Sequence, residues 1–100
     1  MCGIAGIFSK EKISLKKIKV MQESLKHRGP DNQSHIIDID NNFALTNTRL
    51  SIIDLNSNSN QPMKSKKNGN IIVFNGEIYN YKNLRETLIQ NKINLTTYGD

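Results

Sequence analysis

Helix-like and strand-like segments alternate along this chain, and this alternation limits it to a fold that mixes the two kinds of element. The opening run favours a strand, because Ile4, Ile7 and Phe8 are apolar. Ser14 is a typical helix N-cap. Four apolar residues after it fall on one helical face: Leu15, Ile18, Met21 and Leu25. Glycine followed by proline at 29–30 is expected to end this helix.

Turn-forming residues separate the segments that follow. Residues 35–39 and 43–46 flank a polar triplet at 40–42, which predicts a β-hairpin. Residues 49–53 predict a further extended piece. The run DLNSNSN at 54–60 has no apolar period, so an exposed loop is expected there.

The last third of the chain predicts a strand, a helix and a second strand. The turn signal at 68–69 precedes a short apolar run at 71–74, which suits a buried strand. Asn80 is expected to cap a helix whose apolar face holds three residues: Tyr81, Leu84 and Leu88. Residues 93–95 then begin another strand, so the chain is expected to end in the middle of an architecture.

Composition and charge exclude several classes of function. At 100 residues with 36% hydrophobic residues, the chain is expected to be a small folded domain or a piece of one. The net charge of +5 comes from scattered lysines with few aromatic residues between them, so no nucleic-acid partner is expected. No apolar run reaches membrane-spanning length, and no membrane partner is expected. A single cysteine excludes an internal disulfide framework and a multi-cysteine metal site, which favours the cytoplasm.

That single cysteine is Cys2, directly behind the initiator methionine. If Met1 is removed, a thiol and the chain's own amine share one residue. In model peptides an α-amine titrates near ~7.7–8.0 and a thiol near ~8.5, so the amine can accept the thiol proton within about 1 kcal/mol. Nucleophile and base then come from one residue, as in amino-terminal threonine enzymes. A small buried structural cysteine is the alternative that position alone leaves open.

Five motifs, in order, extend over most of the chain: MCGIAGIF at 1–8, HRGPD at 27–31, RLSIID at 49–54, QPM at 61–63 and NGEIYN at 75–80. Together they resemble the glutaminase domain of glutamine-dependent asparagine synthetases, within the class II glutamine amidotransferases. The resemblance implies an α+β fold of the amino-terminal nucleophile hydrolases, an αββα sandwich of two antiparallel sheets, of which residues 1–100 form only the N-terminal part. It also implies hydrolysis of L-glutamine to glutamate and ammonia through a glutamyl thioester, with Cys2 as the nucleophile.

The resemblance carries further site residues onto this chain. Arg49 resembles the family's clamp for the substrate α-carboxylate, which a planar guanidinium can hold bidentately. The backbone that follows it would line the pocket: Leu50, Ser51, Ile52 and Ile53.

Asn75 and Gly76 suit an oxyanion hole, since a side-chain amide and an unobstructed N–H can both face the developing negative charge. An isolated Asn-Gly pair would instead be read as a plain turn. Glu77 and Asp100 would face the substrate ammonium, although Gly99 stands where the family more often has serine. His27 is expected to be structural, because the amino-terminal amine already supplies the base.

The remaining expectations concern what lies outside residues 1–100. No glycine- and serine-rich phosphate loop occurs here, so no cofactor is expected in this chain. ATP and Mg²⁺, together with aspartate, are expected to be bound by a synthetase domain absent from it. The family often dimerises, and some members amidate other carboxylates, such as surface-polysaccharide sugars. A non-catalytic remnant or interaction module is the alternative of a different class.

Overall fold

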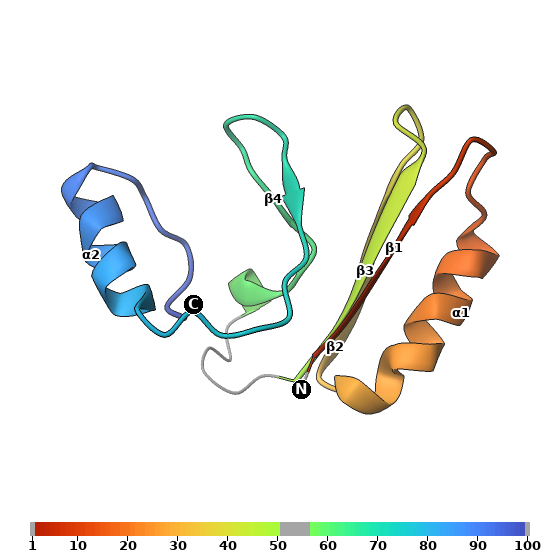
Figure 1. Cartoon of the computed structure of the whole chain (residues 1–100), viewed down its shortest axis with the longest axis horizontal. Helices are drawn as coiled ribbons and strands as arrows, with labels where there is room; N and C mark the ends of the chain where they lie inside the picture. The colour runs from red at the N-terminus through yellow and green to blue at the C-terminus, as the bar shows by residue number, and fades with distance from the viewer. Residues whose placement is uncertain (1, 51–56, 100) are drawn as a thin grey trace.

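The computed structural model describes residues 2–50 and 57–99. Within them a three-stranded antiparallel sheet has the order β1-β3-β2, and a two-stranded antiparallel sheet pairs β4 with β5. The fold is therefore a mixed α+β arrangement with antiparallel sheets. In Figure 1, α1 lies along one side of the larger sheet and the β4–β5 hairpin lies on the other side of that sheet. Helix α2 lies beyond the hairpin, at the end of the molecule opposite α1. The element bounds are β1 Gly3–Phe8, α1 Leu15–Leu25, η1 Lys26–Arg28, β2 Asn32–Asp38, β3 Phe43–Arg49, η2 Ser57–Ser59, β4 Met63–Lys64, β5 Ile71–Ile72 and α2 Tyr81–Gln90.

The first helix begins as its sequence predicts. Ser14 has an extended backbone, and its side chain accepts a hydrogen bond from the Lys17 N–H at 3.3 Å. Such a cap contributes about 1 kcal/mol. Ile18 is fully buried on the sheet, whereas Leu15 is 48% exposed and lies off the buried face. The helix ends at Leu25 and passes into the 3₁₀ turn η1, so the expected stop before Gly29 is confirmed.

A small apolar core joins α1 to one face of the sheet. Ile18 packs there with Ile13 and Ala44, and Ile7, Met21 and Ile37 contact this cluster. Ile7, Ala44 and Ile37 are direct partners across the three strands, so they share one face. Because side chains alternate along a strand, Leu45, Asn47 and Arg49 lie on the opposite face, away from α1.

The predicted hairpin is confirmed, with longer strands than expected. β2 pairs with β3 from Asn32–Arg49 to Asp38–Phe43. In the turn between them Asn42 takes a φ of 50°, a left-handed conformation that asparagine tolerates. Arg49, the first residue of the extended piece predicted at 49–53, is the last residue of β3. Residues 51–53 of that piece lie outside the described residues. Residues 57–59 of the predicted loop form a 3₁₀ turn.

The prediction of a buried strand at 71–74 is wrong in two respects. Only Ile71–Ile72 pair, with Lys64 and Met63, and Ile72 remains 55% exposed. An apolar run predicts burial only if another layer covers it, and within the described residues no layer encloses this hairpin. The tight turn before it is confirmed, because Gly69 adopts a φ of +75°.

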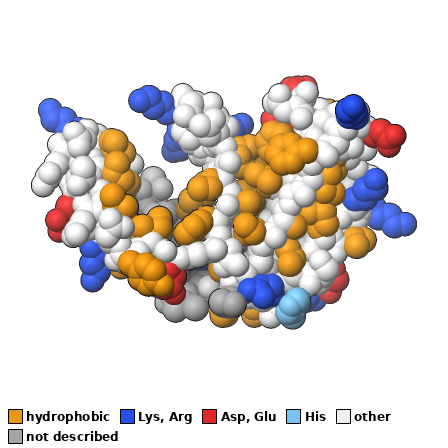
Figure 2. Space-filling view, in the orientation of Figure 1, with side chains coloured by type: hydrophobic (Ala, Val, Ile, Leu, Met, Phe, Trp, Pro, Cys, Tyr) orange, Lys and Arg blue, Asp and Glu red, His pale blue; other side chains and the backbone are white. Residues whose placement is uncertain are grey.

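The second helix forms where the sequence predicts it, but its cap differs. Asn80 has a φ of −96° and a ψ of 24°, and its side chain makes no capping hydrogen bond. A side-chain cap needs an extended backbone at that residue. No residue of α2 is buried, and the strand expected at 93–95 does not form. Figure 2 shows hydrophobic side chains at the surface over the sheet, the hairpin and α2.

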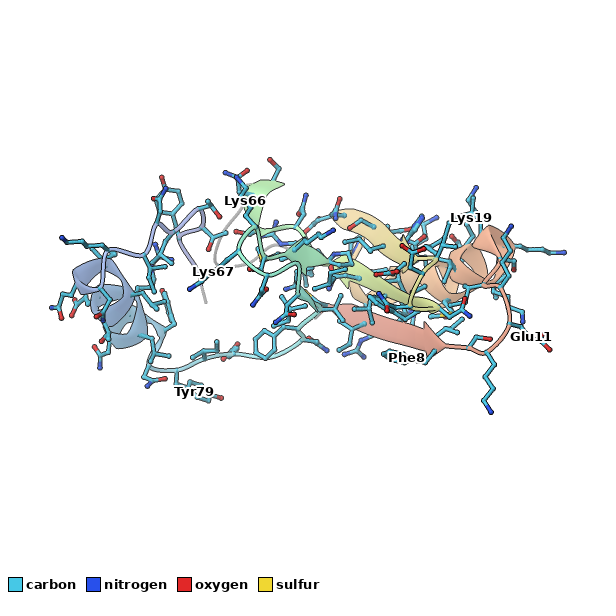
Figure 3. All side chains as sticks on the ribbon, turned by 90° about the horizontal axis from the view of Figure 1, so that it is seen from above. Phe8, Glu11, Lys19, Lys66, Lys67 and Tyr79 are labelled. Carbon is cyan, nitrogen blue, oxygen red and sulfur yellow. The ribbon has the colours of Figure 1, made fainter. Side chains whose placement is uncertain are left out.

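Charged side chains are distributed over separate elements. Lys19 projects from α1, and Lys66 and Lys67 lie in the hairpin turn, away from the helix (Figure 3). Within the described residues no helix is both long enough and apolar enough to span a bilayer.

Candidate active site

Cys2 stands at the end of the larger sheet, one residue before β1. The last pair in the ladder joins Gly3 to Thr48, so continuing the antiparallel register sets Cys2 beside Arg49. The thiol donates toward the Leu50 carbonyl, with 3.8 Å between Sγ and O. The residue is half-buried. The thiol is therefore held at the edge of the fold and is not enclosed in its core.

The HRGPD segment holds both Cys2 and the end of β3. Arg28 Nε donates a hydrogen bond to the Cys2 carbonyl at 3.1 Å. The Asp31 N–H donates to the Arg49 carbonyl at 2.9 Å. Between them, a Cβ on Gly29 would lie 2.3 Å from the Thr48 carbonyl carbon, so only glycine fits. The HRGPD segment therefore holds the backbone of Cys2 and the end of β3 in place next to the thiol.

Arg49 is a buried cation on the face of the sheet that α1 leaves uncovered. It is 9% exposed, and its Nη1 donates to Asn60 Oδ1 at 2.7 Å. Most arginines on strands keep their heads in water, and a buried one needs partners. The planar guanidinium suits a carboxylate ligand, and Asn60 fixes its orientation. Cys2, Arg49 and Leu50 therefore lie at the same end of the sheet, and their roles in a glutaminase site stay predictions.

Asn47 is a buried polar residue that sequence reasoning missed. It precedes Arg49 by two positions on the same face of β3 and is 1% exposed. Neither its amide nitrogen nor its amide oxygen has a hydrogen-bond partner in the described part of the chain. Nothing in the local pattern signals this burial, because Asn47 lies on the central strand of a sheet that forms only in the folded chain.

Asn75, Gly76 and Glu77 lie in the segment between β5 and α2, and all three are exposed. Over residues 2–50 and 57–99, no hydrogen bond joins them to Cys2 or Arg49. The preceding residue is anchored, because the Phe74 N–H donates to Gln61 Oε1. A Cβ on Gly76 would lie 2.8 Å from the Phe74 ring, so these two residues are in close contact. The oxyanion role of Asn75 and Gly76 stays a prediction.

Other candidates fall elsewhere. Ser51, Ile52, Ile53 and Asp100 lie outside the described residues. His27 is exposed in η1, while His35 hydrogen-bonds Gln22 of α1 at 3.1 Å. No three His, Cys, Asp or Glu side chains gather into a possible metal site in the described part of the chain.

The glutamine amidotransferase domain model matches residues 1–100, and the chain therefore belongs to that family. Among individual proteins, it is 41% identical to asparagine synthetase [glutamine-hydrolyzing] 1 of Bacillus subtilis, over 88% of this chain and 14% of that protein. It is 39% identical to a putative asparagine synthetase of Methanocaldococcus jannaschii, over 97% of this chain and 21% of the relative. Asparagine synthetase B of Escherichia coli is 36% identical over 85% of this chain and 15% of its own length. No solved structure matches.

These comparisons confirm the resemblance drawn from the five motifs. They also show that the chain spans only a small part of each of these relatives, between 14% and 21% of their length.

Proposed function

We propose that this chain carries the nucleophile of a glutaminase, which hydrolyses the side-chain amide of L-glutamine to glutamate and ammonia. The observation that carries the proposal is the contact of the Cys2 thiol with the Leu50 carbonyl, next to the buried Arg49 at the same end of the sheet. Membership of the glutamine amidotransferase family supports glutamine as the substrate.

In the first half-reaction, removal of Met1 frees the amine of Cys2, which accepts the thiol proton. The thiolate attacks the amide carbon and forms a C–S bond, and the carbonyl oxygen becomes an oxyanion. The Asn75 side-chain amide and the Gly76 N–H would donate to that oxygen. The C–N bond then breaks, and the ammonium of Cys2 returns the proton to the leaving nitrogen. Ammonia departs, and a glutamyl thioester remains.

In the second half-reaction, water attacks the thioester carbon while the Cys2 amine accepts a proton from it. The C–S bond breaks, glutamate leaves, and the ammonium of Cys2 returns its proton to the sulfur, which restores the thiol. The same amine thus serves as base twice and as acid twice, which requires it to be free and not part of a peptide bond.

Substrate binding would use groups on both sides of the thiol. Arg49 would hold the α-carboxylate through two parallel hydrogen bonds, and Glu77 and Asp100 would hold the α-ammonium. The backbone of residues 50–53 would line the pocket. Holding both α-substituents would let the site select a free amino acid over a bare amide.

In the whole protein, we propose that the ammonia converts aspartate to asparagine at the expense of ATP. The names of the relatives support this acceptor. ATP and Mg²⁺ would be bound outside these 100 residues, in a synthetase domain of a cytoplasmic and dimeric enzyme. Residues 1–100 would form the first part of the αββα glutaminase domain.

The test is to compare Cys2→Ala and Cys2→Ser with the unaltered enzyme, using the whole protein. Both variants are expected to lose glutamine hydrolysis, while synthesis of asparagine from aspartate, ATP and added ammonia continues. Undiminished glutamate release by Cys2→Ala would contradict the proposed nucleophile. Active glutamine hydrolysis without any use of aspartate would contradict only the proposed acceptor.

A further inference from the structure

Gln61 lies where three parts of the fold meet. Its backbone carbonyl accepts a hydrogen bond from Ser34 Oγ on β2, and its side-chain oxygen accepts one from the Phe74 N–H. Its neighbour Asn60 accepts from Arg49 at 2.7 Å. One residue therefore connects the sheet that carries Cys2 and Arg49 to the segment that leads into Asn75.

The side chain of Gln61 takes the place of a missing backbone bond. β4 and β5 pair at Met63–Ile72, and the continuing register sets residue 61 opposite residue 74. The Gln61 backbone carbonyl, which this register would set to accept the Phe74 N–H, accepts from Ser34 Oγ. Gln61 Oε1 instead receives the Phe74 N–H directly. Phe74 in turn is in close contact with Gly76.

The attachment on the sheet side is equally specific. Ser34 lies on the face of the sheet away from α1 and pairs with Asn47 across the strands. The neighbouring pair on that face joins Asn32 to Arg49. Asn32 Nδ2 donates to Ser34 Oγ at 3.3 Å, which directs the Ser34 hydroxyl toward the Gln61 carbonyl. The chain of contacts from Asn32 to Phe74 thus consists of hydrogen bonds at every step.

We propose that Gln61 is a positioning residue for the glutaminase site, fixing the Asn75–Gly76 segment relative to the Cys2 thiol. This inference rests on the proposed function. Oxyanion donors act only within about 2.7–3.1 Å of the developing charge, so a small displacement of their segment removes their effect. Asn75 and Gly76 are exposed and have no hydrogen bond of their own in the described structure. The anchor at Phe74 therefore limits their freedom.

The experiment compares two variants of matched size in the whole protein. Gln61→Met removes the acceptor that binds Phe74, whereas Gln61→Glu keeps an oxygen at the same position. Four quantities are measured for each: kcat for glutamine, KM for glutamine, affinity for the γ-aldehyde analogue of glutamine, and the rate of Cys2 alkylation by iodoacetamide. The aldehyde forms a tetrahedral adduct with an oxygen in the oxyanion position, while alkylation displaces iodide and forms no oxyanion.

We expect Gln61→Met to lower kcat by about tenfold or more with little change in KM, and to weaken aldehyde binding by a similar factor. Alkylation of Cys2 should continue at the unaltered rate, and Gln61→Glu should keep most of the activity. Ser34→Ala, which removes the attachment on the sheet side, should lower kcat in the same way. Should Gln61→Met fail to fold, Ser34→Ala decides the question.

Normal kcat and aldehyde affinity in Gln61→Met would overturn the inference. An equal loss in Gln61→Met, Gln61→Glu and the alkylation rate would overturn it as well, because that pattern reports general damage to the fold. An unaltered enzyme without glutaminase activity would overturn the proposed function and this inference together.

Discussion

Replacing Gly29 with alanine tests how closely the HRGPD segment must pack on β3. The new Cβ would lie 2.3 Å from the Thr48 carbonyl carbon and 2.4 Å from the Arg49 backbone nitrogen. An ordinary van der Waals contact of a Cβ begins at 3.4 Å. These neighbours are backbone atoms of the central strand and cannot rotate away. The segment must therefore move off the strand by about 1 Å.

The size of the effect follows from the contacts that this movement disturbs. Losing the hydrogen bond from the Asp31 N–H to the Arg49 carbonyl costs about 1 kcal/mol, and overpacking adds about 1–3 kcal/mol. The sum is roughly 2–4 kcal/mol of unfolding free energy. For a chain of 100 residues, each kcal/mol lowers Tm by about 4–8 °C, so a fall of about 10 °C or more is expected.

Gly69→Ala is the matched control, and thermal unfolding followed by circular dichroism is the assay. At Gly69 a Cβ has space, with the nearest atom 3.9 Å away, but φ is +75°. That left-handed strain alone costs about 1–2 kcal/mol. A Gly29→Ala protein that melts at or above the Tm of Gly69→Ala would refute the packing argument.

Three further predictions concern other residues. Arg49→Lys should raise KM for glutamine by about 10–100-fold with a smaller change in kcat, because an ammonium cannot hold a carboxylate bidentately; steady-state kinetics checks this. Asn75→Ala should lower kcat by about 10²–10³-fold while Cys2 still reacts with iodoacetamide. An unchanged kcat would contradict the placement of Asn75 in the oxyanion hole. Hydrogen bonds from the Asn41 side chain and backbone hold the pKa of Asp38 below its usual value. This contribution to stability is complete at neutral pH and is lost as pH falls through the lowered pKa. Asn41→Ala should therefore raise the pKa in an NMR titration of Asp38.

Local signals in the sequence predicted the first half of the fold well. The Ser14 cap, the helix after it and the polar turn ending at Asn42 are each determined by neighbouring residues, and each is confirmed. The same signals predicted the tight turn at Gly69. Such features depend on the backbone preferences of the residues concerned, which can be read directly from the sequence.

Features that depend on distant packing were not predictable in this way. Gln22 is buried beside His35 of another element, and Asn47 is buried on the central strand of a sheet that forms only in the folded chain. Ile72 shows the opposite case: it was predicted to be buried and is exposed, because an apolar run predicts burial only where another layer covers it. For the site, motifs indicated Cys2 and Arg49, whereas the bridging role of Gln61 became visible only from its two hydrogen bonds.

The central claim is that Cys2, with its amine freed by loss of Met1, is the nucleophile that attacks glutamine. Intact mass spectrometry tests it most directly, before and after exposure to a glutamine analogue with an electrophilic carbon at the amide position. The account predicts a protein lacking Met1 that gains a single adduct at Cys2, with excess glutamine blocking the reaction. A protein that retains Met1, or one that is processed but gains no adduct at Cys2 in the whole enzyme, would contradict it.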